Sequence, residues 1–220
     1  MIDFDSITFR KIVDCLGSFL CDVPVCYTPV AKLNKTNYVL CVFMGNEEAN
    51  AIRNGTHNPE IQYDNSDVGL HFPDIAISEY YSLESRRNPA AQSAIMDNLT
   101  KNRKMYIKEK KLWFSLFCIL HEIGHWKHFE QSGLLAVDYE KSEHSVRDYY
   151  ERQGDEIRKL PELLFYTQKL DRAKKHYEES HSHIPSEKYA DEYALQNFDD
   201  ALTIFRKAYG YNEEELSAYC

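Results

Sequence analysis

Two histidines in this chain have the spacing of metal ligands, and a glutamate next to them in the sequence could act as a base. His121-Glu-Ile-Gly-His125 is an HExxH motif within the apolar stretch from about Met105 to Phe129. On an α-helix, His121 and His125 leave the same face about 40° apart, so both imidazoles can share one ion. Glu122 lies about 100° further round, where its carboxylate can accept a proton from a water at the metal. The motif predicts a metal-ligand pair with a general base beside it.

The context of the motif favours this interpretation over a chance match. The chain has 9 histidines and 35 acidic residues, so five matching letters alone prove little. The preceding run, Leu112 to Leu120, is uncharged and would bury the helix that carries the motif. The alternative is a pair of exposed surface histidines, which such a buried helix does not favour.

A third metal ligand must come from another segment. Zinc in a hydrolytic site generally has three protein ligands and an open position for water. The best candidate is Glu187 in the segment from Pro185 to Ala194, where Ser186 can cap a helix with Glu187 in its first turn. Asp191 lies one turn further on the same face. We expect Glu187 to complete the metal site and Asp191 to accept the outer N–H of one of the histidines.

Other residues near these segments have less defined roles. Ala190 and Ala194 flank the same face as Glu187, so their helix can approach the metal helix closely. His128 points to the same side as the motif histidines, but three ligands from one straight helix hardly fit a tetrahedral ion. We therefore assign His128 to the surroundings of the site or to the surface. The sequence does not choose the group that stabilises a reacting oxyanion among His176, His181, His183, Tyr189 and Tyr193.

Together, HEIGHWKH and the downstream EKYADEYA resemble the gluzincin metallopeptidases and are similar in particular to the ImmA/IrrE family, whose pattern is an HExxH helix followed by an ExxAN or ExxAD helix. The similar stretches are residues 114–128 and 187–198. About sixty residues separate the two motifs, more than we expect for that family, and residues 131–185 form a helical insertion. No helix-turn-helix signature is visible, so a regulator would be a separate protein.

The resemblance implies a ligand set and a function. It implies Zn²⁺ on His121, His125 and Glu187, with Glu122 as the general base. It also implies an intracellular endopeptidase of bacteria or phages that cleaves a regulatory protein. The alternative is a zincin-like binding or regulatory protein in which the metal is structural or absent.

The surrounding elements must position these residues. With 220 residues and 43% hydrophobic content, we expect a single zincin-like domain over residues 1–220. The fold class is α+β, mainly helical, with a small mixed or antiparallel sheet packed on the metal helix. Residues 38–44 read as a buried strand, and the polar residues 45–67 as a surface excursion with a hairpin. Residues 68–78 read as one strand interrupted at Pro73 or as two short strands, and Pro73 places them at a sheet edge that could bind an extended peptide; ordinary core sheet is the alternative.

Helical spacing and capping residues predict the remaining elements. Residues 6–20 read as one helix capped by Asp5 or Ser6, and 23–30 as irregular or edge strand. Asn88 and Pro89 open another helix, and Gly133 ends the metal helix. Within the insertion, residues 145–160 form a helix that Pro161 breaks before a second helix to residue 177.

Charge and composition limit the partners. The net charge of −9 argues against non-specific binding to nucleic acid or to anionic membranes. The resemblance to metallopeptidases implies a protein or peptide substrate. The first residues lack a signal peptide, no stretch reaches the length of a membrane span, and we expect a cytoplasmic protein. The six cysteines have no CxxC spacing and read as small core residues.

Overall fold

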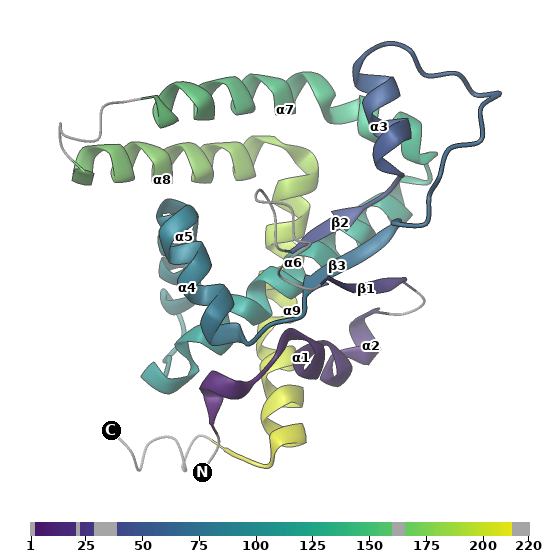
Figure 1. Ribbon diagram of the computed structural model, residues 1–220. Coiled ribbons are helices and arrows are strands. Elements are labelled where there is room, and N and C mark those ends of the chain that lie inside the picture. Colours follow the sequence, from purple (N-terminus) through teal and green to yellow (C-terminus); the bar gives the residue numbers. More distant parts are fainter. Residues whose placement is uncertain (1–2, 21–22, 29–38, 160–165, 213–220) are drawn as a thin grey trace.

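The computed structural model describes residues 3–20, 23–28, 39–159 and 166–212 (Figure 1). Helices dominate it, and three short strands form one small sheet. In chain order the elements are η1 Phe4–Ser6, α1 Phe9–Cys15, α2 Gly17–Leu20, β1 Val25–Thr28, β2 Leu40–Val42, α3 Asn46–Arg53, β3 Gly69–Pro73, α4 Ile77–Arg87, α5 Pro89–Thr100, η3 Ile107–Glu109, α6 Lys110–Ser132, α7 Ala136–Arg158, α8 Tyr166–His183 and α9 Pro185–Tyr209.

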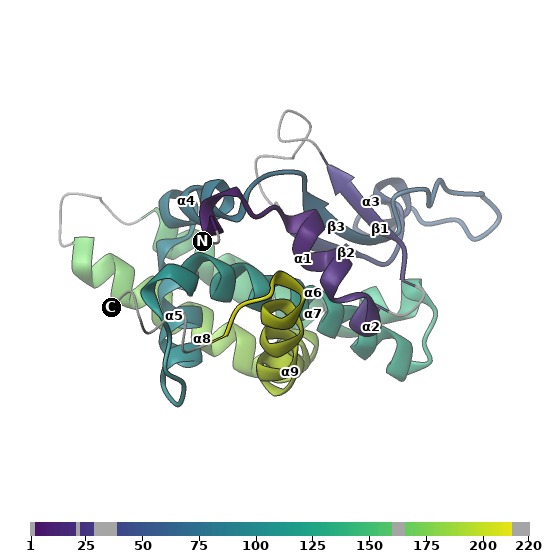
Figure 2. The same cartoon turned by 90° about the horizontal axis from the view of Figure 1, so that it is seen from below.

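Helix α6 lies at the centre of this arrangement. The sheet lies on one side of it and α9 on the other, with α4 and α5 near its first turns (Figure 2). Nearly every residue from Leu112 to His125 on α6 is buried, because apolar side chains leave this helix in all directions. The expected α+β, mainly helical fold is therefore confirmed, and the HExxH motif lies on a core helix.

The sheet is mixed, which is one of the two forms expected, but residues 68–78 do not lie at its edge. The order is β1-β3-β2, with β1 parallel and β2 antiparallel to β3. The prediction that residues 68–78 lie at an edge was therefore wrong, because β3 is the central strand. Pro73 is tolerated there because it is the last residue of β3, and the next N–H, of Asp74, donates to the Thr28 carbonyl at 3.0 Å.

Two further expectations between residues 45 and 78 were also wrong. Residues 46–53 form helix α3 where a surface excursion with a hairpin was expected. Beyond Pro73, a single bridge joins Ala76 to Thr8, and α4 begins at Ile77. Ile77 and Tyr80 bury one face of α4, so the alternating pattern that suggested a second strand belongs to a helix start. The predicted strand over 38–44 is shorter, half-buried β2, and Tyr38 lies outside the described residues.

The N-terminal segment forms two short helices where one was expected. The cap of α1 is Thr8, whose hydroxyl accepts from the Lys11 N–H, whereas Asp5 and Ser6 belong to η1. The chain bends at Leu16, which is fully buried between α1 and α2. Burial of Leu16 takes precedence over continuing the helix.

The caps of two other helices follow the sequence. The Asn88 side chain accepts from the Ala91 N–H and Pro89 is the first residue of α5, as expected. Helix α6 ends at Gly133, whose φ of 63° is the left-handed conformation that glycine adopts readily.

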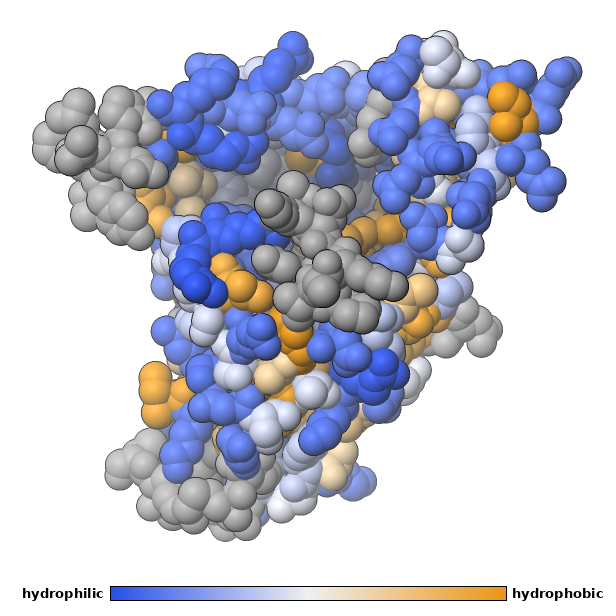
Figure 3. All heavy atoms as spheres, viewed as in Figure 1, coloured by the Kyte–Doolittle hydropathy of each residue, from blue (hydrophilic) through white to orange (hydrophobic). Residues whose placement is uncertain are grey.

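The insertion consists of two long helices packed on the rest of the protein. Helix α7 begins at Ala136, earlier than the expected residue 145, and the expected break at Pro161 lies outside the described residues. Helix α8 contacts α5, α7 and α9, so it closes over the region where α6 and α9 meet. The outer surface of α7 is covered by hydrophilic residues (Figure 3).

Among the described residues, none of the helices combines the length and the apolar content needed to cross a membrane. Four cysteines, Cys15, Cys26, Cys41 and Cys118, carry free thiols and are partly buried. Cys21 and Cys220 lie outside the described residues.

Candidate metal centre

The site is built where α6 and α9 approach most closely. A Cβ atom added to Gly124, within the HExxH motif, would lie 2.7 Å from the Ala190 Cα and 3.1 Å from the Tyr193 Cβ. Because Gly124 and Ala190 lack larger side chains, the two backbones can pack together at this level. Glu187 and Asp191, one turn apart on α9, are thereby brought against the motif histidines.

Three donor atoms converge at this contact. The Nε2 atoms of His121 and His125 are 3.0 Å apart. Each of them lies 3.3 Å from the same carboxylate oxygen, Oε2 of Glu187. Around a tetrahedral ion with bonds of about 2.0–2.1 Å, neighbouring donors stand about 3.3 Å apart. The three side chains are therefore spaced like ligands that share one small divalent ion.

Asp191 fixes the orientation of one of these rings. Its Oδ1 lies 2.9 Å from the Nδ1 of His121. Burial would raise the pKa of Asp191, but hydrogen bonds from the imidazoles of His121 and His181 lower it to about 2. An ionised carboxylate can only accept, so the Nδ1 of His121 donates and its Nε2 is left free for a metal.

Helix α7 holds the second oxygen of Glu187. The Arg147 Nη1 donates to Glu187 Oε1 at 3.0 Å, and its Nη2 donates to the Ser186 hydroxyl at 3.1 Å. Glu143, one turn before Arg147, accepts from the Ser186 N–H at 2.7 Å and also contacts the Ser186 hydroxyl. Ser186 therefore lies inside the first turn of α9, after Ile184 at the cap position, and does not cap the helix as expected. Because Arg147 of α7 contacts Oε1 of Glu187, the other oxygen, Oε2, is directed at the imidazoles.

Glu122 lies beside the three donors and is not one of them. Burial raises its pKa, while the His125 and His121 imidazoles and a hydrogen bond from the Cys41 N–H act in the opposite direction. Cys41 belongs to β2, so the carboxylate lies between the metal helix and the outer side of that strand. A partly buried carboxyl with a raised pKa is better suited to accepting a proton from water than a carboxyl with the ordinary pKa.

The charges of the donors depend on one another. Burial would lower the pKa of His121, but Asp191 and Glu187 outweigh it and raise this pKa well above 6.5. Burial would raise the pKa of Glu187, but His125 and His121 hold it well below its ordinary value. Without a metal, the carboxylates favour an imidazolium between them. A divalent cation would replace that proton and satisfy the same carboxylates.

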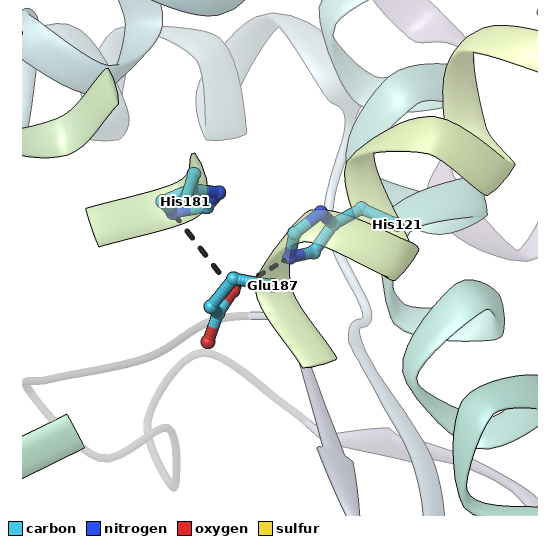
Figure 4. Close-up of side chains that lie close together, drawn as sticks. All are labelled: His121, His181 and Glu187. Carbon is cyan, nitrogen blue, oxygen red and sulfur yellow. Dashed lines mark ion pairs between the residues drawn. The ribbon is translucent and has the colours of Figure 1, made fainter. Parts of the chain in front are cut away.

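His181 joins this group from the end of α8. Glu187 lies between His181 and His121 (Figure 4), and the His181 Nε2 is 3.8 Å from Glu187 Oε2. One ligand atom from each of these three residues lies within 4.8 Å of the other two. The His181 Nδ1 lies 3.0 Å from Oδ2 of Asp191. His181 therefore belongs, with His121 and Glu187, to a group of side chains that could hold a metal ion, and the sequence did not place His181 among the ligands.

The other residues considered from sequence lie elsewhere. His128 shares a hydrogen bond of 2.7 Å with the Tyr139 hydroxyl, and its ring is 5.0 Å from that of Tyr189. It therefore neighbours the site on α6 without contacting the metal donors. His176 packs beside Tyr150, and His183 is exposed. The Cβ of Tyr193 lies against Gly124 at the α6–α9 contact.

Sequence reasoning missed two contributions of the insertion. Arg147 was not considered, and His181 was considered only as an oxyanion donor. A local signal existed for His181, which precedes Glu187 by six residues in HSHIPSE. No local signal distinguished Arg147 from other arginines on a solvated helix face. Imidazoles and one carboxylate at buried or partly buried positions form a donor set that could hold a metal ion. No protein-family model, curated protein or solved structure matches this chain.

Proposed function

We propose that this protein is a zinc-dependent endopeptidase whose metal is held by His121, His125 and Glu187, with Glu122 as the general base. The observation that carries the proposal is the convergence of three donor atoms at spacings of 3.0 to 3.3 Å next to a partly buried carboxyl that is not a donor. A purely structural metal has no need of such a carboxyl at its side. A catalytic metal does, because hydrolysis requires a base.

Each residue has a stated task in hydrolysis. When bound, zinc would supply Lewis acidity for water and for the substrate carbonyl. Glu122 accepts a proton from the attacking water and later donates one to the leaving amine nitrogen. Asp191 holds His121 in the tautomer that presents Nε2. Arg147 fixes the carboxylate of Glu187.

The sheet supports a peptide as the substrate. Within the described residues, β2 has β3 on one side only, and the Cys41 N–H on its other side is directed to Glu122. An extended peptide added beside β2 would lie against the general base, which is the geometry of strand addition. This replaces the edge expected at residues 68–78. On the resemblance to the ImmA/IrrE family, the substrate would be a regulatory protein.

The test uses zinc-loaded protein and a mixture of quenched fluorescent peptides with randomised sequences. Glu122→Gln should retain zinc and slow cleavage by about 10²–10⁴-fold, the usual contribution of a general base. His125→Ala should lose both zinc and cleavage. The matched control is Glu192→Gln, the same substitution at an exposed glutamate on α9, which should cleave like the wild type. An unchanged rate in Glu122→Gln would refute the mechanism.

A second function has its own supporting observation. His181 lies close enough to Glu187 to act as a fourth donor, and a metal with four protein ligands is the pattern of a structural site. The protein would then be a zincin-like binding or regulatory protein. Zinc bound at full occupancy without cleavage of any peptide, in the wild type and in variants of His181, would favour this second function.

A further inference from the structure

His181 is presented to the metal centre in the same way as His121. Asp191 uses one oxygen for each ring, with Oδ1 2.9 Å from the Nδ1 of His121 and Oδ2 3.0 Å from the Nδ1 of His181. Because an ionised carboxylate only accepts, both rings must donate from Nδ1 and keep Nε2 free. Metal-binding histidines generally donate their other ring N–H to such a partner. One carboxylate thus prepares two imidazoles as ligands.

The fold also holds the ring of His181 in place. Tyr177, one turn earlier on α8, has its ring centroid 3.9 Å from that of His181, and the His121 ring is 5.5 Å away on the other helix. The side chain of His181 is only 16% exposed. The other two histidines of α8 differ in this respect, since His183 is exposed and His176 lies towards α7. His181 is therefore packed into the site.

The spacing places His181 where a fourth ligand would stand. Its Nε2 is 3.8 Å from Glu187 Oε2, against about 3.3 Å between neighbouring donors of a tetrahedral zinc. A shift of about half an ångström would bring His181 to this spacing from Glu187, which is within the reach of a small ring rotation, and a nitrogen of His181 also lies within 4.8 Å of one of His121. His121, His125 and Glu187 already define the other three positions. The remaining position is the one that a water needs for hydrolysis.

We propose that His181 is a fourth protein ligand, so that α8 closes the metal site of the resting protein and restrains its activity. This proposal rests on the proposed peptidase function. Hydrolysis then requires that His181 leave the metal or that the ion accept a fifth ligand. The insertion is the regulatory element, because it supplies the closing imidazole from α8 and the Arg147 contact to Glu187 from α7.

The decisive measurement counts imidazole ligands by X-ray absorption at the zinc edge of the full-length, zinc-loaded protein. Wild type and the control His183→Ala should show three imidazoles, and His181→Ala should show two. His183 is a matched control because it lies on the same turn of α8, where its Nδ1 lies 2.7 Å from the Glu179 carbonyl oxygen. Two imidazoles in the wild type would overturn the proposal.

A second measurement probes access to the metal. Acetohydroxamate binds zinc through a free position, so its affinity should rise at least about tenfold in His181→Ala and remain unchanged in His183→Ala. Equal affinity in all three proteins would overturn the proposal. If His181→Ala fails to fold, His181→Gln replaces it, because the glutamine side chain can still pack against Tyr177 but is a weak zinc ligand.

Cleavage rates separate this proposal from the peptidase function on which it rests. Faster cleavage of the peptide mixture by His181→Ala supports both. Slower cleavage with zinc retained means that His181 acts on the substrate, which overturns the closing role and leaves the peptidase intact. Three imidazoles in the wild type with no cleavage by any variant would refute the peptidase while the fourth ligand stands.

Discussion

Acidic side chains lie at each end of the contact between α6 and α9, and the two ends differ in how the negative charges are satisfied. Near the start of α6, the fully buried Glu109 carboxylate accepts from Arg206 at 2.7 and 2.9 Å, from the Tyr211 hydroxyl at 2.9 Å and from the Trp113 ring at 3.3 Å. One carboxylate meets one guanidinium, and both oxygens have donors. Nothing at this end calls for a ligand.

The metal end of the same helix pair has too many acceptors. Four carboxylates, from Glu122, Glu143, Glu187 and Asp191, lie around the histidines, and Arg147 is the cation that contacts two of them. The free Nε2 atoms and Glu187 Oε2 point at one another at 3.0 to 3.3 Å, where they repel unless a proton or a metal lies between them. The comparison teaches that the charge of Glu109 is matched by donors of the protein itself, whereas the donors at the other end leave room for a proton or a metal ion.

The largest expected effect is a loss of stability at the Glu109 end that leaves zinc affinity at the other end nearly unchanged. Glu109→Ala removes the buried carboxylate that accepts from two nitrogens of Arg206, so the free energy of unfolding should fall by about 3–5 kcal/mol in urea titrations. Zinc affinity of the folded variant should stay within a few-fold of wild type. The double variant Glu109→Met with Arg206→Met should recover part of the loss, because apolar side chains can replace a buried pair. A loss below about 1 kcal/mol would contradict the structural role.

A smaller effect is expected where the helices touch between the two clusters. In Gly124→Ala the new Cβ meets the backbone of Ala190, which cannot move aside without its helix. The free energy of unfolding should fall by about 1–3 kcal/mol, and zinc affinity should fall with it because Glu187 is carried on the displaced helix. The control is Gly17→Ala, which has open space around it and should change stability by less than about 1 kcal/mol. An unaltered zinc affinity would show that metal binding does not depend on the spacing between α6 and α9.

The smallest expected effect is a pH dependence of stability and zinc affinity, which comes from the charge of His121. Asp191 and Glu187 raise the pKa of His121 above its ordinary 6.5, although burial opposes them. In the metal-free protein the bound proton stabilises the fold below pH 6.5, and this stabilisation is lost as the pH rises through the raised pKa. Zinc must displace that proton, so below the raised pKa zinc affinity should fall about tenfold per pH unit.

Two titrations check this pH dependence. Urea unfolding of metal-free protein should show decreasing stability above pH 6.5, and zinc titration against a chelator should show increasing affinity over the same range. In Asp191→Asn one of the three carboxylates that raise the His121 pKa is replaced by a neutral amide, so both curves should shift to lower pH. Identical curves for this variant and the wild type would show that Asp191 does not set the charge of His121.

The sequence by itself determined the local features of this protein. Helical periodicity placed His121 and His125 on one face of a buried helix, Asn88 and Pro89 marked a helix start, and Gly133 marked a helix end. These outcomes depend on residues within one or two turns of each other, and caps and periodicity act over that range. The mainly helical fold with a small sheet followed from the same local patterns, which left a mixed and an antiparallel sheet both open.

Only the tertiary structure decided how distant segments meet. The edge prediction for residues 68–78 failed because a strand's neighbours, β1 and β2 here, are set by long-range pairing that Pro73 at a strand end does not prevent. Arg147 and His181 reach the metal centre because α7 and α8 fold back over α9, and periodicity on a single helix cannot reveal that contact. His121 and His125 are one turn apart on a single helix, so the sequence predicts their pairing, whereas the groups around them come together only when α6, α7, α8 and α9 pack.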